Sequence, residues 1–265
     1  KISIMPTKLG QNFLNDPAVL EKIIQVSAPE SVDFVIEIGP GKGVLTEQLA
    51  KCAEKIIAIE LDDKLIPILR QKFTETKNVE IIHEDILKIN IPKLLSDYKL
   101  KTTNYKLIAN IPYYITSPII RLFLEQEKQP QEIFLMIQKE VAERIVAKAG
   151  KMSILAVSVQ YYAQAEIMFA VSKNSFSPAP KVDSAVIRIK PNKKFEKEID
   201  RKFFRVVKAG FSAKRKTLLN NLASSLQLEK NLVEEKIKTA GLQPTVRAQE
   251  LSIDDWKILS SLLEK

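Results

Sequence analysis

The stretch VIEIGPGKG, from Val35 to Gly43, decides the fold class, because an apolar run passes here directly into a turn that holds three of the chain's seven glycines. Glycines let the backbone turn tightly after a strand and approach a bound nucleotide or amino-acid group closely, with a helix starting behind the turn. A purely structural turn or a dinucleotide site could also carry this pattern. By itself, the stretch predicts a strand, turn and helix of an α/β sheet and leaves the ligand open.

Apolar runs typical of strands alternate with helix-like segments through the first two thirds of the chain, which predicts a doubly wound, mostly parallel sheet. The last two runs are too close in sequence for a crossover helix, so we expect them to form an antiparallel pair. The expected strands cover 34–38, 55–60, 79–83, 106–110, 133–138, 166–171 and 184–190.

After Pro191 the composition changes to a charged stretch and then to helical periodicity without strand signals. We expect helices near 200–210, 214–226, 229–240 and 252–263. The sequence therefore predicts two domains, an α/β ligand-binding domain over 1–191 and a small all-α domain over 192–265.

The chain carries a net charge of +9 and has a pI near 9.4. This balance indicates a polyanionic partner, because lysines and arginines that neutralise phosphates release bound counterions. Between positions 201 and 228 there are seven basic residues and no acidic one, whereas a solvated helix face usually mixes both signs. The stretch favours RNA binding by the second domain through Arg201, Lys202, Arg205, Lys208, Lys214, Arg215 and Lys216.

Some classes of chemistry are disfavoured by what the sequence lacks. The single Cys52 cannot form an internal disulfide, and with His83 as the one histidine the chain lacks the usual ligands of a zinc site or a Ser-His arrangement. We expect no metal and no functional role for either residue. No apolar run approaches the roughly 20 residues of a membrane span, and no secretion signal is visible. We expect a cytoplasmic protein that does not contact a membrane.

Two acids follow the second and third expected strands, at the sheet edge where open α/β folds bind ligands. Glu60 ends the second apolar run, about twenty residues after the glycine turn, where an acid accepts hydrogen bonds from ribose hydroxyls. Asp85 follows the third run and could accept from an adenine amine. The G-x-G-x-G spacing differs from the G-x-G-x-x-G of dinucleotide folds. The pattern therefore favours an adenosine ligand over a nicotinamide dinucleotide.

The tetrapeptide NIPY, Asn110 to Tyr113, ends the fourth expected strand. The N6 lone pair of adenine is delocalised into the ring, so acceptors that hold the two amine protons favour its attack on a methyl sulfonium. The Asn110 side-chain oxygen and the carbonyl of Ile111 could supply them, while Pro112 stiffens the turn and Tyr113 offers a stacking face. Such catalysis needs positioning and electrostatics but no general base. An ordinary Asn-Pro turn would explain the proline alone.

These motifs, together with QNFL (11–14), NIPYYITSPII (110–120) and FSPAPKVDSAV (176–186), resemble the KsgA family of ribosomal RNA adenine N6,N6-dimethyltransferases over nearly the whole chain. The resemblance implies a Rossmann-like sheet that uses S-adenosylmethionine to dimethylate two adjacent adenines of small-subunit ribosomal RNA during subunit biogenesis. It implies that Tyr113 and Phe176 sandwich the flipped adenine and that Asn110 touches both cofactor and target amine. The implied cofactor residues are Asn12, Leu14, Gly39, Gly41, Glu60, Asp85 and Asn110.

Three other functions remain open from the sequence. The Erm type methylates large-subunit RNA and shares NIPY and the glycine turn, but GFSAKRKTLLNNL (210–222) and RAQELS (247–252) resemble the helical domain of the small-subunit family. A non-catalytic RNA-binding assembly factor is a second alternative, and a nicotinamide dehydrogenase a third. In KEVAERI (139–145) we expect mainly packing, with Lys139 and Arg144 near phosphate. We expect a monomer, with the assembling small subunit as its partner.

Overall fold

The computed structural model describes residues 12–28, 34–98, 105–111 and 115–264. The chain divides into two compact units, Lys1–Ala142 with Glu166–Pro191 and Glu143–Ala165 with Asn192–Lys265. The second unit thus includes the segment 143–165 in addition to the residues that follow Pro191. Composition alone assigns that segment to the first domain.

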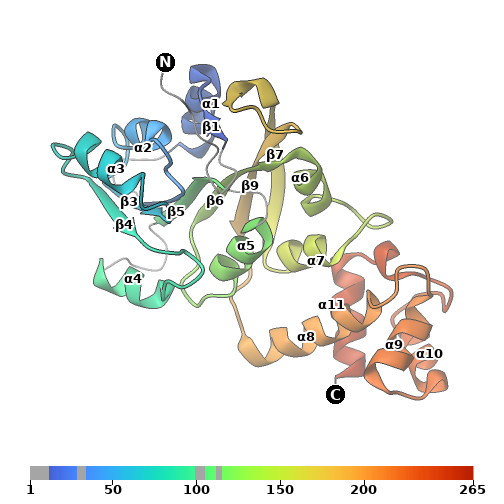
Figure 1. Cartoon of the computed structure of the whole chain (residues 1–265). Coiled ribbons are helices and arrows are strands. Elements are labelled where there is room, and N and C mark those ends of the chain that lie inside the picture. The colour runs from blue at the N-terminus through green and yellow to red at the C-terminus, as the bar shows by residue number, and fades with distance from the viewer. Residues whose placement is uncertain (1–11, 29–33, 99–104, 112–114, 265) are drawn as a thin grey trace. The chain divides into compact units, whose positions relative to one another are not determined.

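A seven-stranded sheet forms the centre of the first unit, in the order β4-β3-β2-β5-β6-β9-β7 among the described residues (Figure 1). Neighbours from β4 to β6 run parallel, and β9 runs antiparallel to β6 and separates it from β7. The expected mostly parallel sheet with an antiparallel last strand is confirmed. The strands are β2 (Phe34–Ile38), β3 (Lys55–Glu60), β4 (Val79–His83), β5 (Tyr105–Asn110), β6 (Glu132–Gln138), β7 (Ala163–Val171) and β9 (Ser184–Pro191).

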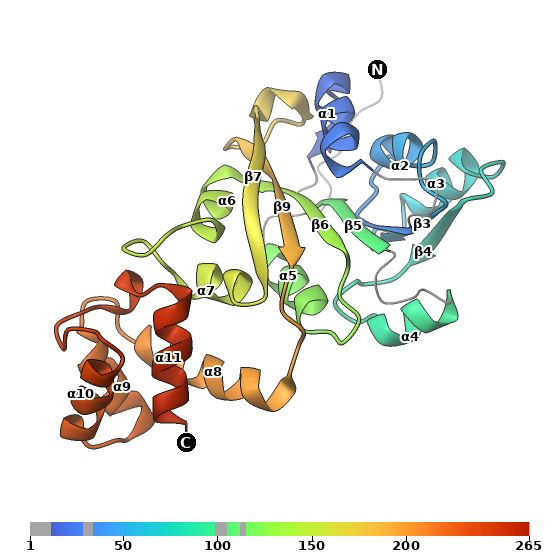
Figure 2. The same cartoon turned by 180° about the vertical axis from the view of Figure 1, so that it is seen from behind.

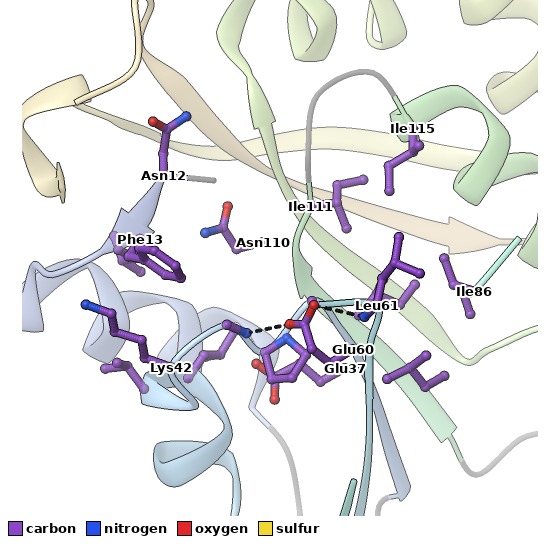
Figure 3. A pocket seen from close by; sticks show the side chains of 18 of the residues that line it. Asn12, Phe13, Glu37, Lys42, Glu60, Leu61, Ile86, Asn110, Ile111 and Ile115 are labelled. Carbon is purple, nitrogen blue, oxygen red and sulfur yellow. Dashed lines mark hydrogen bonds between the residues drawn. The ribbon is translucent and has the colours of Figure 1, made fainter. Parts of the chain in front are cut away.

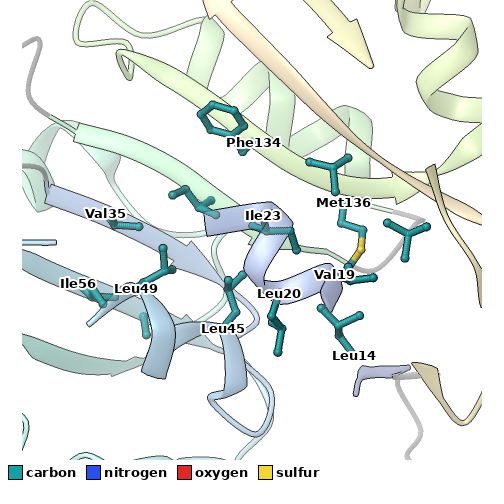
Figure 4. Packing of buried hydrophobic residues seen from close by; sticks show 14 of the residues in the cluster. Leu14, Val19, Leu20, Ile23, Val35, Leu45, Leu49, Ile56, Phe134 and Met136 are labelled. Atoms are coloured by element: carbon teal, nitrogen blue, oxygen red, sulfur yellow. The ribbon is translucent and has the colours of Figure 1, made fainter. Parts of the chain in front are cut away.

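Helices cover both faces of this sheet, as crossover connections between parallel strands require. Figures 1 and 2 show α1, α2 and α3 over one face, and α4 and α5 over the other. The helices of this unit are α1 (Pro17–Ser27), α2 (Val44–Leu49), α3 (Ile66–Lys72), α4 (Ile91–Asp97) and α5 (Thr116–Leu124), and α6 (Lys139–Ile145) follows β6. Apolar residues of α1 and α2 pack on the sheet in a buried cluster that includes Leu20, Ile23, Leu49, Val35, Ile56 and Phe134 (Figure 4).

A separate ribbon of two very short strands, β1 (Phe13–Leu14) and β8 (Phe176–Ser177), joins the start of the chain to the segment before β9. The strands pair antiparallel, with Phe13 opposite Ser177 and Leu14 opposite Phe176. The short helix η2 (Lys173–Ser175) leads into β8. Two-residue strands carry no periodicity that a sequence could reveal, so the ribbon is an addition to the expected fold.

The second unit is helical, with α7 (Ile154–Gln160), α8 (Lys197–Gly210), α9 (Leu218–Leu226), α10 (Lys230–Thr239), η3 (Ala248–Glu250) and α11 (Ile253–Leu263). Its core forms around the fully buried Trp256 of α11. Gly210 at the end of α8 lets this ring approach, since a Cβ there would lie 2.4 Å from the ring atom Cη2 of Trp256. α9 starts four residues later than the sequence pattern indicates, because the Thr217 hydroxyl caps it by accepting from Asn220 N.

Lys214, Arg215 and Lys216 therefore lie in the loop before α9, and all three are exposed. We call these three residues the basic loop. The side chain of Asn221, which is buried, donates to the carbonyls of Gly210 (2.6 Å) and Ala213 (3.0 Å) and fixes the start of the loop. The basic residues of α8 are partly neutralised within the chain, since Arg201 pairs with Glu198 and Arg205 with Glu264. Two of the seven basic residues between positions 201 and 228 thus have acidic partners within the chain.

Candidate active site

A cavity of about 460 Å³ opens in the first unit at the carboxyl ends of β2, β3, β4 and β5. Its walls come from the glycine turn after β2, the loops after β3 and β4, the end of β5 and the β1–β8 ribbon (Figure 3). Cavities of a few hundred Å³ hold ligands of the size of a cofactor, and this is the edge at which open α/β sheets bind them.

The glycine turn is built from alternating left-handed residues, which explains its G-x-G-x-G spacing. Gly39, Gly41 and Gly43 have φ values of 67°, 60° and 70°, a region that other residues rarely adopt. The turn also allows close packing, since a Cβ at Gly41 would lie 3.2 Å from the ring of Phe13, and one at Gly43 would lie 2.6 Å from the ring of Phe73. The floor of the cavity therefore depends on the absence of side chains here.

Glu60, at the end of β3, is buried and held by three backbone amides. Its Oε1 accepts from Leu61 N and Asp62 N, both at 2.9 Å, and its Oε2 accepts from Gly41 N at 3.1 Å (Figure 3). A carboxylate offers about four acceptor positions, so this fixed group retains capacity for hydroxyl donors in the cavity. The bond to Gly41 N also joins the acid to the glycine turn.

Glu37 is a second acid of the cavity, and its environment differs from that of Glu60. Its side chain is 1% exposed, and Oε2 has no hydrogen-bond partner among the described residues. Removal of the carboxyl from water raises its pKa to about 8, and the nearby charge of Glu60 acts in the same direction. Glu37 is therefore largely protonated near neutral pH.

The third acid, Asp85, lies in the loop after β4, where its Oδ1 accepts from Leu87 N at 3.0 Å. Apolar side chains lie beside the acids at both strand ends, namely Leu61 after Glu60, and Ile86 and Leu87 after Asp85. Leu61 and Leu87 are 48% and 43% exposed, which is high for leucine. Acceptors flanked by apolar walls suit a flat heterocycle that carries donor groups at its edge.

The remaining walls hold the residues that the sequence links to methyl transfer. Asn110 ends β5 and Ile111 follows it, and both line the cavity, as do Asn12, Leu14 and Phe176 of the ribbon region. Figure 3 shows the side chains of Asn12 and Asn110 on the same side of the cavity. Phe176 is also part of the buried cluster under α1, so its ring is both core and cavity wall. Pro112 and Tyr113 lie outside the described residues.

One cavity thus collects eight of the nine residues assigned from the sequence, and the ninth is Tyr113. Three further groups at its wall are not indicated by the sequence patterns: Glu37, the apolar pair Leu61 and Leu87, and Lys42 with Phe13. The Lys42 ammonium lies 4.8 Å from the centre of the Phe13 ring. Glu37 belongs to the EIGPGKG motif, and its place at a buried strand end was the signal that could have identified it. The eight residues are Asn12, Leu14, Gly39, Gly41, Glu60, Asp85, Asn110 and Phe176.

Other expectations concern residues outside the cavity. Lys139 and Arg144, at the two ends of α6, are exposed. Cys52 is half-buried in the turn after α2, and His83 is exposed at the end of β4. In the described part of the chain, no three His, Cys, Asp or Glu side chains are grouped as a metal site would require. Within the same residues, no helix has the length and apolar character needed to cross a membrane.

Comparison with known proteins identifies the family. The model of the family described as ribosomal RNA adenine dimethylase matches residues 4–265. Among curated relatives, a protein of Dehalococcoides mccartyi named ribosomal RNA small subunit methyltransferase A is 44% identical over 95% of this chain and 86% of its own length. Proteins of the same name from Clostridioides difficile and Bacillus pumilus are 41% and 40% identical, over 96% and 97% of this chain and 89% and 90% of their own lengths.

Solved structures resemble the fold as a whole. A dimethyladenosine transferase from Plasmodium falciparum matches with a TM-score of 0.78 and 28% identity, over 93% of this chain and 95% of its own. The 23S rRNA methyltransferase ErmE matches with a TM-score of 0.75 and 25% identity, over 96% of this chain and all of its own. With a family match over nearly its full length and relatives above 40% identity, the chain belongs to the ribosomal RNA adenine dimethylase family.

Proposed function

We propose that this protein transfers methyl groups from S-adenosylmethionine to N6 of two adjacent adenines in small-subunit ribosomal RNA, giving N6,N6-dimethyladenosine during subunit assembly. The observation that carries this proposal is the meeting of two sets of residues in one cavity. The acids Glu60 and Asp85 at the ends of β3 and β4 suit an adenosine group, and Asn110 at the end of β5 suits an amine acceptor of the methyl group.

The residues of the cavity fit S-adenosylmethionine. Glu60 has acceptor capacity for the ribose hydroxyls, and Asp85 with Leu61 and Leu87 offers an acceptor between apolar walls for the adenine. Gly39 and Gly41 carry no side chain that would occupy the space beneath the methionine part of the cofactor. Asn12 and Leu14 line the wall that the ribbon contributes. When bound, the cofactor supplies a methyl group on a reactive sulfonium.

The protein's own contribution to the transfer is positional. The Oδ1 of Asn110 and the carbonyl of Ile111 accept the two protons of the target amine and so free its lone pair for in-line attack. Phe176 and Tyr113 stack on the adenine after it has left its helix. The proton leaves to water after transfer, so no side chain has to act as a general base.

The choice between small-subunit and large-subunit RNA rests on the relatives and on the second unit. The similarity to ErmE and to a dimethyladenosine transferase is nearly equal, so the fold does not discriminate between the substrates. The relatives above 40% identity are named for the small subunit. We assign catalysis to 1–191 and RNA docking to 192–265, with the exposed basic loop on phosphates. One cavity and one basic loop require only a monomer, which acts in the cytoplasm.

The test compares methyl transfer by the wild type and by Asn110→Ala. Both are incubated with labelled S-adenosylmethionine and undermethylated small subunits, and the RNA is digested to nucleosides. Loss of one positioned polar group costs on the order of 100-fold in rate, so the variant should make almost no dimethyladenosine. Asn90→Ala is the matched control, since Asn90 caps α4 outside the cavity and should retain activity. Cofactor binding without transfer by the wild type would favour a non-catalytic assembly factor.

A further inference from the structure

We propose that the β1–β8 ribbon makes binding of the cofactor and of the target adenine cooperative, and that Asp16 and Ser175 are the positioning residues that carry this coupling. The inference rests on the proposed function, because it assigns the two ligands to the two strands of the ribbon. Neither Asp16 nor Ser175 lines the cavity.

The first strand of the ribbon is shaped by the cofactor side of the cavity. Leu14 and the preceding Asn12 line the cavity directly. The Phe13 ring lies against the glycine turn, 3.2 Å from the position of a Cβ at Gly41, with the ammonium of Lys42 4.8 Å from its centre. A ligand that fills the space above the glycine turn therefore acts directly on the position of β1.

The second strand carries the residue that is to stack on the adenine. Phe176 lies opposite Leu14 in the ladder, and both side chains belong to the same buried cluster. The residue before it, Ser175, is held through two hydrogen bonds by the two residues that connect β1 to α1. Asn15 N donates to the Ser175 carbonyl at 2.9 Å, and the Ser175 hydroxyl donates to Oδ2 of Asp16 at 2.7 Å.

Asp16 links Ser175 to helix α1 of the first unit. Its Oδ1 accepts from the amides of Ala18 and Val19 and so caps the first turn of α1, while its Oδ2 accepts from Ser175. The hydrogen bond from Ser175 is the main factor that lowers the pKa of the Asp16 carboxyl, as expected when a hydroxyl donates to the ionised form. One carboxylate thus joins the start of α1 to the residue that precedes Phe176.

Cooperativity follows from the small size of the ribbon. A ladder with two residues on each strand has little stability of its own, so its order depends on what it packs against. A ligand that orders one strand also orders the other through the ladder and the bond between Asp16 and Ser175. The protein then loses less conformational entropy when the second ligand binds. The resulting increase in affinity is the same whichever ligand binds first.

The test measures this coupling in the full-length protein. The dissociation constant of labelled S-adenosylhomocysteine is determined with and without saturating undermethylated small subunits, and the ratio is the coupling factor. In wild type we expect a factor of at least about 5, the lower end of ordinary coupling. Ser175→Ala should reduce it by up to about 5-fold, the value of one net hydrogen bond, while affinity without subunits changes by less than about twofold.

Two variants separate coupling from simple destabilisation. Ser172→Ala removes a hydroxyl from the same turn, one that accepts from Asn174 N and does not touch Asp16, and it should retain the coupling factor of the wild type. Ser175→Thr keeps the hydroxyl and should restore the coupling. A Ser175→Ala factor equal to that of wild type, or an equal loss in Ser172→Ala, would overturn the proposal. Wild-type methyl transfer is measured on the same preparation: transfer with a coupling factor of one refutes the coupling alone, and no transfer refutes the function beneath it.

Discussion

The buried acid Glu37 should make the stability of the protein fall as the pH rises through the neutral range. Its pKa is raised to about 8 by burial, whereas a carboxyl in the unfolded chain titrates near 4.3. Between these values the folded state binds a proton that the unfolded state has released. The free energy of unfolding therefore decreases with pH, by about 1.4 kcal/mol per unit. The contribution is complete below the unfolded pKa and is lost as the pH passes the folded one.

Glu37→Gln isolates this effect, because glutamine imitates the protonated carboxyl at every pH. The difference between wild type and variant should change by about 3.5 kcal/mol between pH 5 and pH 8, with the variant relatively more stable at the higher pH. Urea unfolding followed by circular dichroism at several pH values measures this difference. Glu54→Gln, at an exposed acid before β3, is the control and should show no such trend. Parallel curves for wild type and Glu37→Gln would refute the reasoning.

Three further predictions concern packing, the ion pair of a buried acid and the basic loop. Gly43→Ala should lower the free energy of unfolding by about 2 kcal/mol or more, because φ is 70° and the added Cβ would meet the Phe73 ring. Gly150→Ala, whose Cβ would face open space, should cost only about 1 kcal/mol, and thermal unfolding measures both. Asp200→Ala removes a buried acid that pairs with the partly exposed Lys193 and accepts from the buried Tyr161 hydroxyl. It should cost about 2 kcal/mol in urea unfolding, against less than about 0.5 for the exposed Glu198→Ala. Alanine at all three positions of the basic loop should flatten the slope of log affinity for RNA against log salt by about 2 to 3; an unchanged slope would exclude the loop from phosphate contact.

The parts of the fold that the sequence predicted are those with strong periodicity. The mostly apolar runs that became β2, β3 and β4 were assigned to the residue. β2 and β3 are buried along most of their length, as in a parallel strand covered on both faces, whereas the edge strand β4 is only partly buried. β7 begins at Ala163, three residues earlier than expected, since its first residues lack a continuous apolar pattern. The later start of α9 reflects the Thr217 cap, whose signal competes with good helix formers before it.

Within the cavity, the sequence revealed residues that follow strands and missed those whose role depends on tertiary contact. Glu60 and Asp85 were assigned from their positions at strand ends, and the cavity brings them together. Phe13 and Lys42 interact across nearly thirty positions, and nothing in either local pattern indicates this. The hydrogen bond between Asp16 and Ser175 spans most of the domain. Local patterns cannot specify such pairs, because their geometry arises only when the sheet has formed.

A competition between the two possible RNA substrates tests the proposed function directly. Wild-type protein is incubated with labelled S-adenosylmethionine and equal amounts of undermethylated small and large ribosomal subunits. The subunits are then separated and their RNA is digested to nucleosides. We expect label in N6,N6-dimethyladenosine from the small subunit alone. Label in the adenines of the large subunit instead would contradict the proposed function and place the protein with the Erm type.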